Sequence, residues 1–396
     1  MKIKVNRQEL LRSWQIAMKY VASQTPNVEL TGIRMIAKAD DTLTLEATDM
    51  KRAVKRAVIC LVDAPGEALL NAAMLGDMLK KSSAEWLTLE TTEKRGTLTT
   101  EFSRMRFTII PSASYPQLPS SQDAEEICEI DEADFVRLVV EGGNASSRPS
   151  EFPKYMGTCL LRSGDGKLIV VSTDGRRLSL SQSQCDVKMD MDLVVPASSL
   201  KDLVKDLTCK GTLQVKVDGA MMWFIVKGAE YSIRLIDTTF PKYEKILKDE
   251  YVSKLRVNRN ALIGALERIA VIANNTENRI MAMQLGSDLK LRARAAGLGT
   301  AQETISGVQL EGANLLIGFN VNFLLEGLKA ISTEDVLMEF SGDGEQVRIY
   351  NSDVRDFLYM LMPVKLSSQD ISDDVGDDEA VNAENNDINN EDVVGE

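Results

Sequence analysis

Apolar and polar residues alternate in pairs of short segments at three places along the chain. The segments GIRMIAKADDTLTLEATD (32–49) and GTCLLRSGDGKLIVVSTD (157–174) each alternate, pass through an acidic turn and alternate again. The segment IMAMQLGSDLKLRARA (280–295) repeats this pattern less closely. Because successive side chains of a strand point to opposite faces, each segment predicts a β-hairpin.

Helical periodicity follows the same repeat. A first set of segments carries a polar residue and then apolar residues at helical intervals, beginning at Val5, Ile130 and Val257. A second, shorter set begins at Asn71, Pro196 and Asn320, at spacings of 125 and 124 residues. Proline is tolerated at a helix start, where its missing N–H has no helical partner to lose. The pattern therefore predicts two helices in each repeat.

The order strand, helix, strands, helix, strands predicts three similar domains. The first two repeats end in strands that run into linkers with aromatic residues and proline, at 107–119 and 231–247. We expect an α+β fold in which each domain packs two helices on one face of antiparallel sheets, because the order does not fit a βαβ parallel sheet. The expected divisions are three domains at 1–122, 123–248 and 249–366, followed by a disordered acidic tail at 367–396.

Composition removes several classes of protein. No apolar run approaches the ~18 residues of a membrane span, and the polar start of the chain does not look like a signal peptide. The five cysteines are scattered without a CxxC pair, which indicates reduced thiols in a cytoplasmic protein. The chain has no histidine, so Ser-His-Asp and Cys-His mechanisms are excluded. We expect no enzyme, no cofactor, no metal site and no membrane contact.

The net charge of −13 is concentrated at the end of the chain. Of the 59 acidic residues, 11 lie in 367–396, which leaves 48 against 46 Lys and Arg in 1–366. The body is thus nearly neutral and can still place cations on one surface. The tail has few apolar residues and is expected to be disordered. It either only aids solubility or, as a tethered acidic segment, weakens the binding of partners near Leu366.

The turn at 173–178 reads TDGRRL and allows several interpretations. Asp-Gly favours turns for backbone reasons alone, so a plain hairpin turn is one of them. A binding turn is a second. A third is an enzyme, for example a metal-dependent hydrolase using Asp49 and Asp174, although consecutive domains would hold these acids apart and Ala295 stands at the third equivalent position. The Gly297-Leu298-Gly299 fragment lacks the third glycine of a dinucleotide fingerprint.

With these motifs in order on a threefold repeat, residues 1–366 resemble the bacterial sliding clamp family, the β subunit of DNA polymerase III. The resemblance rests on TDG with RL at 173–178, FP with Tyr243 at 240–243, IGFNV at 317–321 and MPVKL at 362–366. It implies a DNA sliding clamp: a head-to-tail homodimeric ring that encircles duplex DNA without sequence preference. An adaptor that binds proteins without forming a ring is the alternative.

The resemblance also implies a hydrophobic cleft between the second and third domains. There the replicative DNA polymerase, the clamp loader and other proteins with clamp-binding peptide motifs would dock. By position, the residues of this partner-peptide cleft are Met156, Thr173, Gly175, Arg177, Leu178, Pro241, Ile246, Asn320, Phe323, Met362, Pro363, Val364 and Leu366. Methionine and leucine would give an adaptable apolar floor, and Arg177 would bond a peptide carbonyl.

Two further surfaces follow from the resemblance. The helices would line the hole, and the candidate DNA-facing cations are Arg12, Lys19, Lys80, Lys81, Lys201, Lys205 and Arg268. A solvated helix face is the alternative for Arg12 and Lys19. The dimer interface would join Phe107 of one chain to Val271 and Ile272 of the other.

The chain also departs from the family pattern at several positions. Many relatives carry His at Arg176, and they often carry arginine at Gln24. Basic residues common at the start of the second helices are replaced by Ala73-Met74 and Ala197-Ser198.

Overall fold

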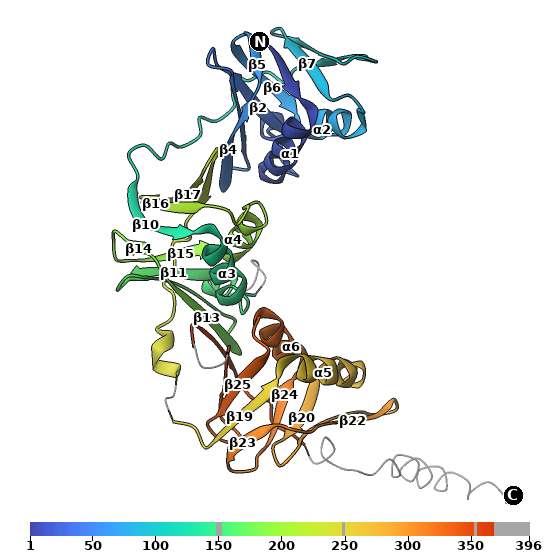
Figure 1. Ribbon diagram of the computed structural model, residues 1–396, viewed down its shortest axis with the longest axis vertical. Coiled ribbons are helices and arrows are strands. Elements are labelled where there is room, and N and C mark those ends of the chain that lie inside the picture. The colour runs from blue at the N-terminus through green and yellow to red at the C-terminus, as the bar shows by residue number, and fades with distance from the viewer. Residues whose placement is uncertain (148–152, 248–249, 352–354, 368–396) are drawn as a thin grey trace, which may run out of the picture. The chain divides into compact units, whose positions relative to one another are not determined.

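The computed structural model describes residues 1–147, 153–247, 250–351 and 355–367. The predicted border between the second and third domains, at 248/249, lies outside these residues, as does the predicted tail from 368 onward. All six predicted helices are present (Figure 1). Their bounds are α1 Arg7–Ala17, α2 Ala72–Lys81, α3 Glu132–Gly142, α4 Ala197–Val204, α5 Arg259–Ala273 and α6 Val321–Ala330. None of the described helices is long and apolar enough to cross a membrane.

Strands make up most of the remaining chain. In the first part they are β1 Lys2–Asn6, β2 Gly32–Ala37, β3 Thr42–Thr48, β4 Arg52–Ile59, β5 Leu61–Ala64, β6 Gly66–Asn71, β7 Trp86–Thr91, β8 Arg95–Thr99 and β9 Arg104–Thr108. They continue with β10 Glu125–Asp131, β11 Thr158–Gly164, β12 Lys167–Thr173, β13 Arg177–Gln184, β14 Asp186–Val187, β15 Met191–Pro196, β16 Thr212–Asp218, β17 Met221–Val226 and β18 Ala229–Arg234. The last are β19 Ser253–Asn258, β20 Ile280–Gln284, β21 Leu289–Ala295, β22 Gly299–Ile305, β23 Gln309–Gly312, β24 Leu316–Asn320, β25 Asp335–Phe340, β26 Val347–Tyr350 and β27 Phe357–Leu361.

The chain forms two compact units. The first comprises Met1–Val139, Gly157–Ile169 and Ser183–Thr239; the second comprises Val140–Met156, Val170–Gln182 and the chain from Phe240. The chain thus passes from one unit to the other several times, twice within the stretch that carries the TDGRRL turn.

In the first unit, two sheets are built on antiparallel pairs. One has the order β5-β1-β7-β8-β9 and the other β14-β10-β16-β17-β18-β4-β3-β2-β6. Strands β2 and β3 pair with Arg34 opposite Glu46, which confirms the first predicted hairpin. Trp14 of α1 is fully buried and donates its indole N–H to the carbonyl of Ala72, 2.8 Å away, at the start of α2. This contact ties the two helices of the first repeat together.

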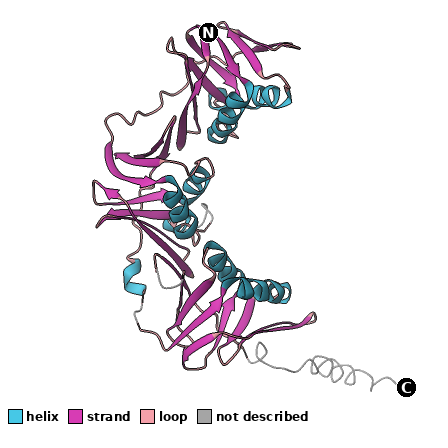
Figure 2. Ribbon diagram, in the orientation of Figure 1, coloured by secondary structure: helices cyan, strands magenta, loops and turns pink. Residues whose placement is uncertain are grey.

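In the second unit, a sheet with the order β22-β21-β20-β24 contains the third predicted hairpin, β20–β21. Another run of strands has the order β13-β27-β26-β25-β19-β23. Helices α5 and α6 pack on these sheets through buried side chains such as Leu266 and Leu328, which belong to one core cluster with Met281 and Phe319. Figure 2 distinguishes the helices from the strands that they cover.

Four of the six helices begin at an asparagine. The side chains of Asn6, Asn71, Asn258 and Asn320 each accept a hydrogen bond from a backbone N–H of the first helical turn. Such caps satisfy N–H groups that have no partner within the helix. Pro196 stands at the corresponding position of α4, without a side-chain cap. The equivalent start of all three second helices agrees with the predicted repeat.

Candidate peptide-binding site

The turn TDGRRL is closed by its own side chains. Thr173 donates its hydroxyl to the carbonyl of Arg177 at 2.7 Å, and it accepts from the N–H of Gly175 at 3.1 Å. The Asp174 carboxylate accepts from the N–H groups of Arg176 and Arg177 at 3.0 and 3.1 Å. Gly175 has φ +84°, a left-handed conformation that suits glycine. The local sequence therefore specifies this turn completely.

The Arg177 side chain is buried beneath the turn. Its Nε donates to Asp174 at 3.0 Å, and Nη1 donates to Glu326 of α6 and to the Tyr359 hydroxyl, 3.1 Å away. The guanidinium also stacks 4.4 Å from the centre of the Phe323 ring. Burial raises the pKa of Tyr359, whose hydroxyl donates to the Phe323 carbonyl at 2.8 Å. Nε and Nη1 of Arg177 thus have their partners within the protein.

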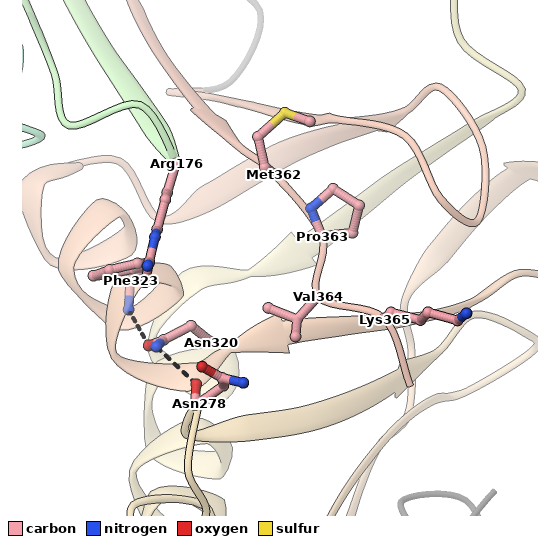
Figure 3. A pocket seen from close by; sticks show the side chains of 8 residues that line it. All are labelled: Arg176, Asn278, Asn320, Phe323, Met362, Pro363, Val364 and Lys365. Carbon is pink, nitrogen blue, oxygen red and sulfur yellow. Dashed lines mark hydrogen bonds between the residues drawn. The ribbon is translucent and has the colours of Figure 1, made fainter. Parts of the chain in front are cut away.

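A pocket of about 340 Å³ lies beside this turn (Figure 3). One side comes from Arg176 and from α6, where Asn320 caps the helix and donates its amide to the Asn278 carbonyl at 2.9 Å. The other side comes from the chain after β27, and Figure 3 shows Arg176 extending toward Phe323 across from it. The lining residues are Arg176, Asn278, Asn320, Phe323, Met362, Pro363, Val364 and Lys365.

The segment after β27 is held by two backbone bonds. The N–H of Met362 donates to the Arg176 carbonyl at 2.9 Å, and that of Val364 donates to the Gly318 carbonyl at 2.8 Å. A Cβ at Gly318 would lie 2.4 Å from the Val364 carbonyl oxygen, so only glycine admits this approach. On from this segment lies a second pocket, of about 470 Å³, which shares Pro363, Val364 and Lys365 with the first. The two pockets adjoin at these three residues and are together called the groove below.

The predicted cleft residues fall into three groups. Asn320, Phe323, Met362, Pro363 and Val364 line the first pocket, and Leu366 lines the second. Thr173, Arg177 and Leu178 are buried in the turn and its strand, and Met156 packs against Gly175. Pro241 and Ile246 are exposed and line neither pocket.

Three residues that line the first pocket were absent from the predicted set. In the sequence, Arg176 stands out only as a departure from the family pattern. Its position in the TDGRRL turn, next to Arg177, could nevertheless have predicted that it lines the site. Lys365 stands within the quoted segment MPVKL. Asn278 contributes to the pocket from the loop before β20, and no local pattern distinguishes it from other loop residues.

Several of the candidate DNA-facing cations are already paired. Lys19 binds Asp206, Lys205 binds Asp202 at 3.0 Å, and Arg268 forms a two-point ion pair with Glu303 at 2.7 and 2.8 Å. Lys201, on α4, is half-buried. Among the candidates, the exposed cations that make no ion pair with another described residue are Arg12, Lys80 and Lys81.

The candidate dimer residues differ in exposure. Val271, on α5, is 67% exposed, whereas Ile272 packs partly against the core of the second unit. Phe107 is buried, with its ring over Gly96. Near it in the first unit, Phe102 is 75% exposed and lines a pocket of about 490 Å³ with Met74, Met78 and Met105.

Asp49 and Asp174, the acids of the alternative hydrolase, belong to different units and share one structural role. Each carboxylate caps its own turn and binds the arginine three residues later. Neither carboxylate is free to act as a base or to hold a metal ion without breaking its turn.

Comparisons with known proteins agree with this architecture. Three domain models of the DNA polymerase III beta subunit match in order: the N-terminal domain at 1–119, the central domain at 130–242 and the C-terminal domain at 244–365. The beta sliding clamp of Synechococcus elongatus is 26% identical over 381 residues, covering 93% of this chain and all of that protein.

Solved structures give the same result for the fold. The crystal structure of the Bacillus subtilis DNA polymerase sliding clamp matches with a TM-score of 0.87 at 21% identity, covering 93% of this chain and all of that one. The Pseudomonas aeruginosa sliding clamp bound to griselimycin matches with a TM-score of 0.87 at 24% identity, covering 92% and 100%.

Three clamp-type domains of antiparallel sheets with paired helices define the class of protein as a DNA sliding clamp, as the sequence predicted. The chain belongs to the DNA polymerase III beta subunit family. Membership of this family of non-enzymatic processivity factors confirms that the protein is not an enzyme. The domain boundaries at 122/123 and 248/249 stay predictions.

Proposed function

We propose that this protein is a cytoplasmic, homodimeric ring that encircles duplex DNA and holds replication proteins to it through the groove beside Phe323. The observation that carries the proposal is the combination of a threefold clamp repeat with a pocket at the predicted peptide site. Five of the predicted cleft residues line that pocket, from two segments far apart in the sequence.

The partners proposed for the groove are the replicative DNA polymerase, the clamp loader and other proteins that carry short clamp-binding peptides. Phe323, Met362 and Val364 offer apolar surface for the peptide's hydrophobic side chains, while Asn320 and Arg176 offer polar groups at the rim. Burying two apolar side chains contributes roughly 3 to 6 kcal/mol. Association itself costs about 4 kcal/mol or more. The resulting affinity is weak to micromolar, which allows partners to exchange.

The ring requires two chains, because three clamp domains supply half of the six modules that the family resemblance implies. A head-to-tail contact between unlike surfaces closes into a ring when the rotation between subunits allows it. The proposed seam joins Phe107 of one chain to Val271 and Ile272 of the other. Exposed Phe102, with Met74, Met78 and Met105 around it, provides further apolar surface close to Phe107.

The proposed grip on DNA is topological. Arg12, Lys80 and Lys81 can approach phosphates freely, whereas Lys19, Lys205 and Arg268 would first have to exchange a carboxylate for a phosphate. Contacts to phosphates carry no sequence information. Direct affinity for duplex DNA should therefore be low, and it should fall steeply with salt.

Retention on circular DNA tests the ring. The full chain is loaded onto nicked circular DNA with a clamp loader, and the complex is separated from free protein by gel filtration before and after linearisation. The expected result is retention on the circle and loss from the linear form. Equal retention on both would contradict the ring and would favour a direct DNA binder; no retention on either would favour the adaptor.

The seam is tested by Ile272→Asp. A charge placed in an apolar interface is costly without a partner, so the variant should be monomeric at micromolar concentration by sedimentation, with Val28→Asp, an exposed apolar residue outside the seam, as the matched control. A variant that stays dimeric would place the seam elsewhere.

A further inference from the structure

Two of the five cysteines lie next to each other in the first unit. Cys128 is in the middle of β10 and fully buried, and Cys185 directly precedes the edge strand β14 and is half-buried. Strands β10 and β14 pair antiparallel with Cys128 opposite Val187 and Glu129 opposite Asp186. Cys185, two residues before Val187, therefore lies on the same face of the sheet as Cys128, diagonally across the pair.

This register places the two side chains near enough for the Cys128 thiol to act as a hydrogen-bond donor toward Cys185. The backbone holds them there: the N–H of Cys185 donates to the Gly166 carbonyl at 3.0 Å, and that of Lys188 donates to the Ile127 carbonyl at 2.8 Å. The named strand β14 is only two residues long and forms the end of its sheet. Diagonal neighbours of an antiparallel pair lie about 7–8 Å apart, so closing a disulfide of ~2.05 Å requires this short edge segment to move toward β10.

The contact also makes the two thiols unequal. The hydrogen bond from Cys128 lowers the pKa of Cys185, against the opposing effects of burial and of Asp186, and the same bond raises the pKa of Cys128. Cys185 is thus the more readily ionised and the more accessible of the pair. Burial raises the pKa of Cys60 to about 11 and that of Cys159 to about 12, so these two stay protonated thiols.

We propose that Cys128 and Cys185 form an oxidisable dithiol that closes to an intrachain disulfide when the protein meets a peroxide. The thiolate of Cys185 attacks one peroxide oxygen, the O–O bond breaks, and hydroxide leaves and takes up a proton as water. The Cys128 sulfur then attacks the resulting sulfenic acid, the S–O bond breaks, and the hydroxyl leaves with the Cys128 proton as a second water. Two thiols are oxidised and one peroxide is reduced to two waters.

Closure would join the segment that leads into the edge strand β14 covalently to its neighbouring strand β10. Because a cross-link restricts the unfolded chain, the oxidised protein should resist thermal unfolding better than the reduced protein. Reduction by dithiothreitol should reverse both the cross-link and the stabilisation. The proposal does not depend on ring formation or on peptide binding.

Peptide mapping of the full chain tests the proposal. Fully reduced protein is treated with hydrogen peroxide, its remaining thiols are alkylated with N-ethylmaleimide, and a protease digest is analysed by mass spectrometry. The expected result is a peptide linking Cys128 to Cys185, with the loss of two alkylatable thiols. The proposal is overturned if both cysteines are recovered alkylated, or if Cys185 is oxidised to a sulfinic acid while Cys128 stays alkylatable.

Two variants complete the experiment. Cys185→Ser should lose the linked peptide and the oxidation-dependent rise in unfolding temperature. Cys209→Ser, which removes an exposed cysteine from another loop, should keep both. A linked peptide that instead contains Cys209, or that disappears in Cys209→Ser, would overturn the proposal. Neither variant alters the buried Cys128, so the test does not depend on a replacement in the core.

Discussion

The turns Thr48–Arg52 and Thr173–Arg177 are built in the same way in the two units of the chain. In each, the threonine hydroxyl donates to the arginine carbonyl, the aspartate accepts from two backbone N–H groups, and the arginine Nε donates to the aspartate. Each arginine then reaches an acid on the second helix of the following repeat, Asp202 or Glu326.

The similarity extends to the end of the third strand after each helix, β18 after α4 and β27 after α6. The N–H of Arg234 donates to the Lys51 carbonyl at 2.8 Å, just as that of Met362 donates to Arg176. The N–H of Ile236 donates to the Val194 carbonyl at 2.9 Å, just as that of Val364 donates to Gly318. The two regions, one around each turn, therefore have equivalent backbone hydrogen bonds between turn and strand end.

What differs is the side chains mounted on this framework. The groove has Phe323, Met362 and Pro363, whereas the corresponding positions of the first unit carry Ser199, Arg234 and Leu235. The Asp-Arg ion pair is thus a structural contact that the chain uses twice, and the residues around one copy form the proposed peptide site. In this view the turn that carries TDGRRL contributes Arg176 to recognition, while Asp174 and Arg177 hold it in place.

The largest effect is expected from removing the buried arginine. Arg177→Ala leaves Asp174, whose side chain is 12% exposed, without its partner and should destabilise the second unit by about 3 kcal/mol. Arg52→Ala should cost the first unit only about 1 kcal/mol, because Arg52 and Asp49 are 20% and 22% exposed and better solvated. Urea unfolding measures the loss of unfolding free energy in both variants. Equal losses would show that burial does not make the Arg177 pair more important than the Arg52 pair.

The probes can separate the two units. All three tryptophans, Trp14, Trp86 and Trp223, belong to the first unit, so their fluorescence should follow Arg52→Ala. Far-ultraviolet circular dichroism reports both units and should reveal the loss in Arg177→Ala. Arg176→Ala, a change at the exposed neighbouring arginine, is the matched control and should leave the unfolding midpoint unchanged.

The next effect concerns binding. Met362 lines the groove and is 42% exposed, so Met362→Asp places a charge where a partner's apolar side chain must pack. Affinity for a fluorescently labelled polymerase peptide, measured by anisotropy, should fall by about tenfold or more. Arg234→Asp changes the equivalent strand end of the first unit and should leave peptide affinity as it was. A Met362→Asp protein that binds normally would move the peptide site elsewhere.

The threefold repeat could be predicted from the sequence because local patterns specify its helices and strands. Alternation, helical spacing and polar residues at helix starts, such as Asn71 and Asn320, specify elements without reference to distant segments. The groove residues were predicted only from the family resemblance. The resemblance does not distinguish the residues that line the groove from the buried residues that support it. That distinction depends on which of Arg176 and Arg177 the fold buries. Glu326, the acid that binds the buried Arg177 from outside its own turn, lies 149 residues away in the sequence.

A smaller effect is expected at the rim of the groove. Arg176 is exposed and extends toward Phe323, where its charge can attract an acidic peptide segment or donate to a peptide carbonyl. Exposed charges contribute on the order of 1 kcal/mol or less, so Arg176→Ala should weaken peptide binding by a few-fold at low salt and by less at high salt. Lys51→Ala, at the same position of the other turn, should have no effect on peptide binding. An effect of Arg176→Ala that does not change with salt would exclude the electrostatic explanation.

The smallest effect is expected at the equivalent positions Met50 and Gly175 of the two turns. Substitutions there should change the free energy of unfolding in opposite directions. Met50 and Gly175 both have positive φ, 72° and 84°, which costs a side-chain-bearing residue about 1 kcal/mol or more. Gly175→Ala should therefore destabilise the second unit by about 1 kcal/mol, and Met156, 3.3 Å from the new Cβ, can move aside. Met50→Gly should stabilise the first unit by about 0.5 kcal/mol, since the relief of strain exceeds the added freedom of the unfolded chain. Met50→Ala keeps the strain and is the control. If Met50→Gly were no more stable than Met50→Ala by tryptophan fluorescence in urea, the positive φ would not be the cause of the expected difference. A Met50→Ala protein less stable than the wild type would show instead that the methionine side chain, 56% exposed, contributes contacts of its own.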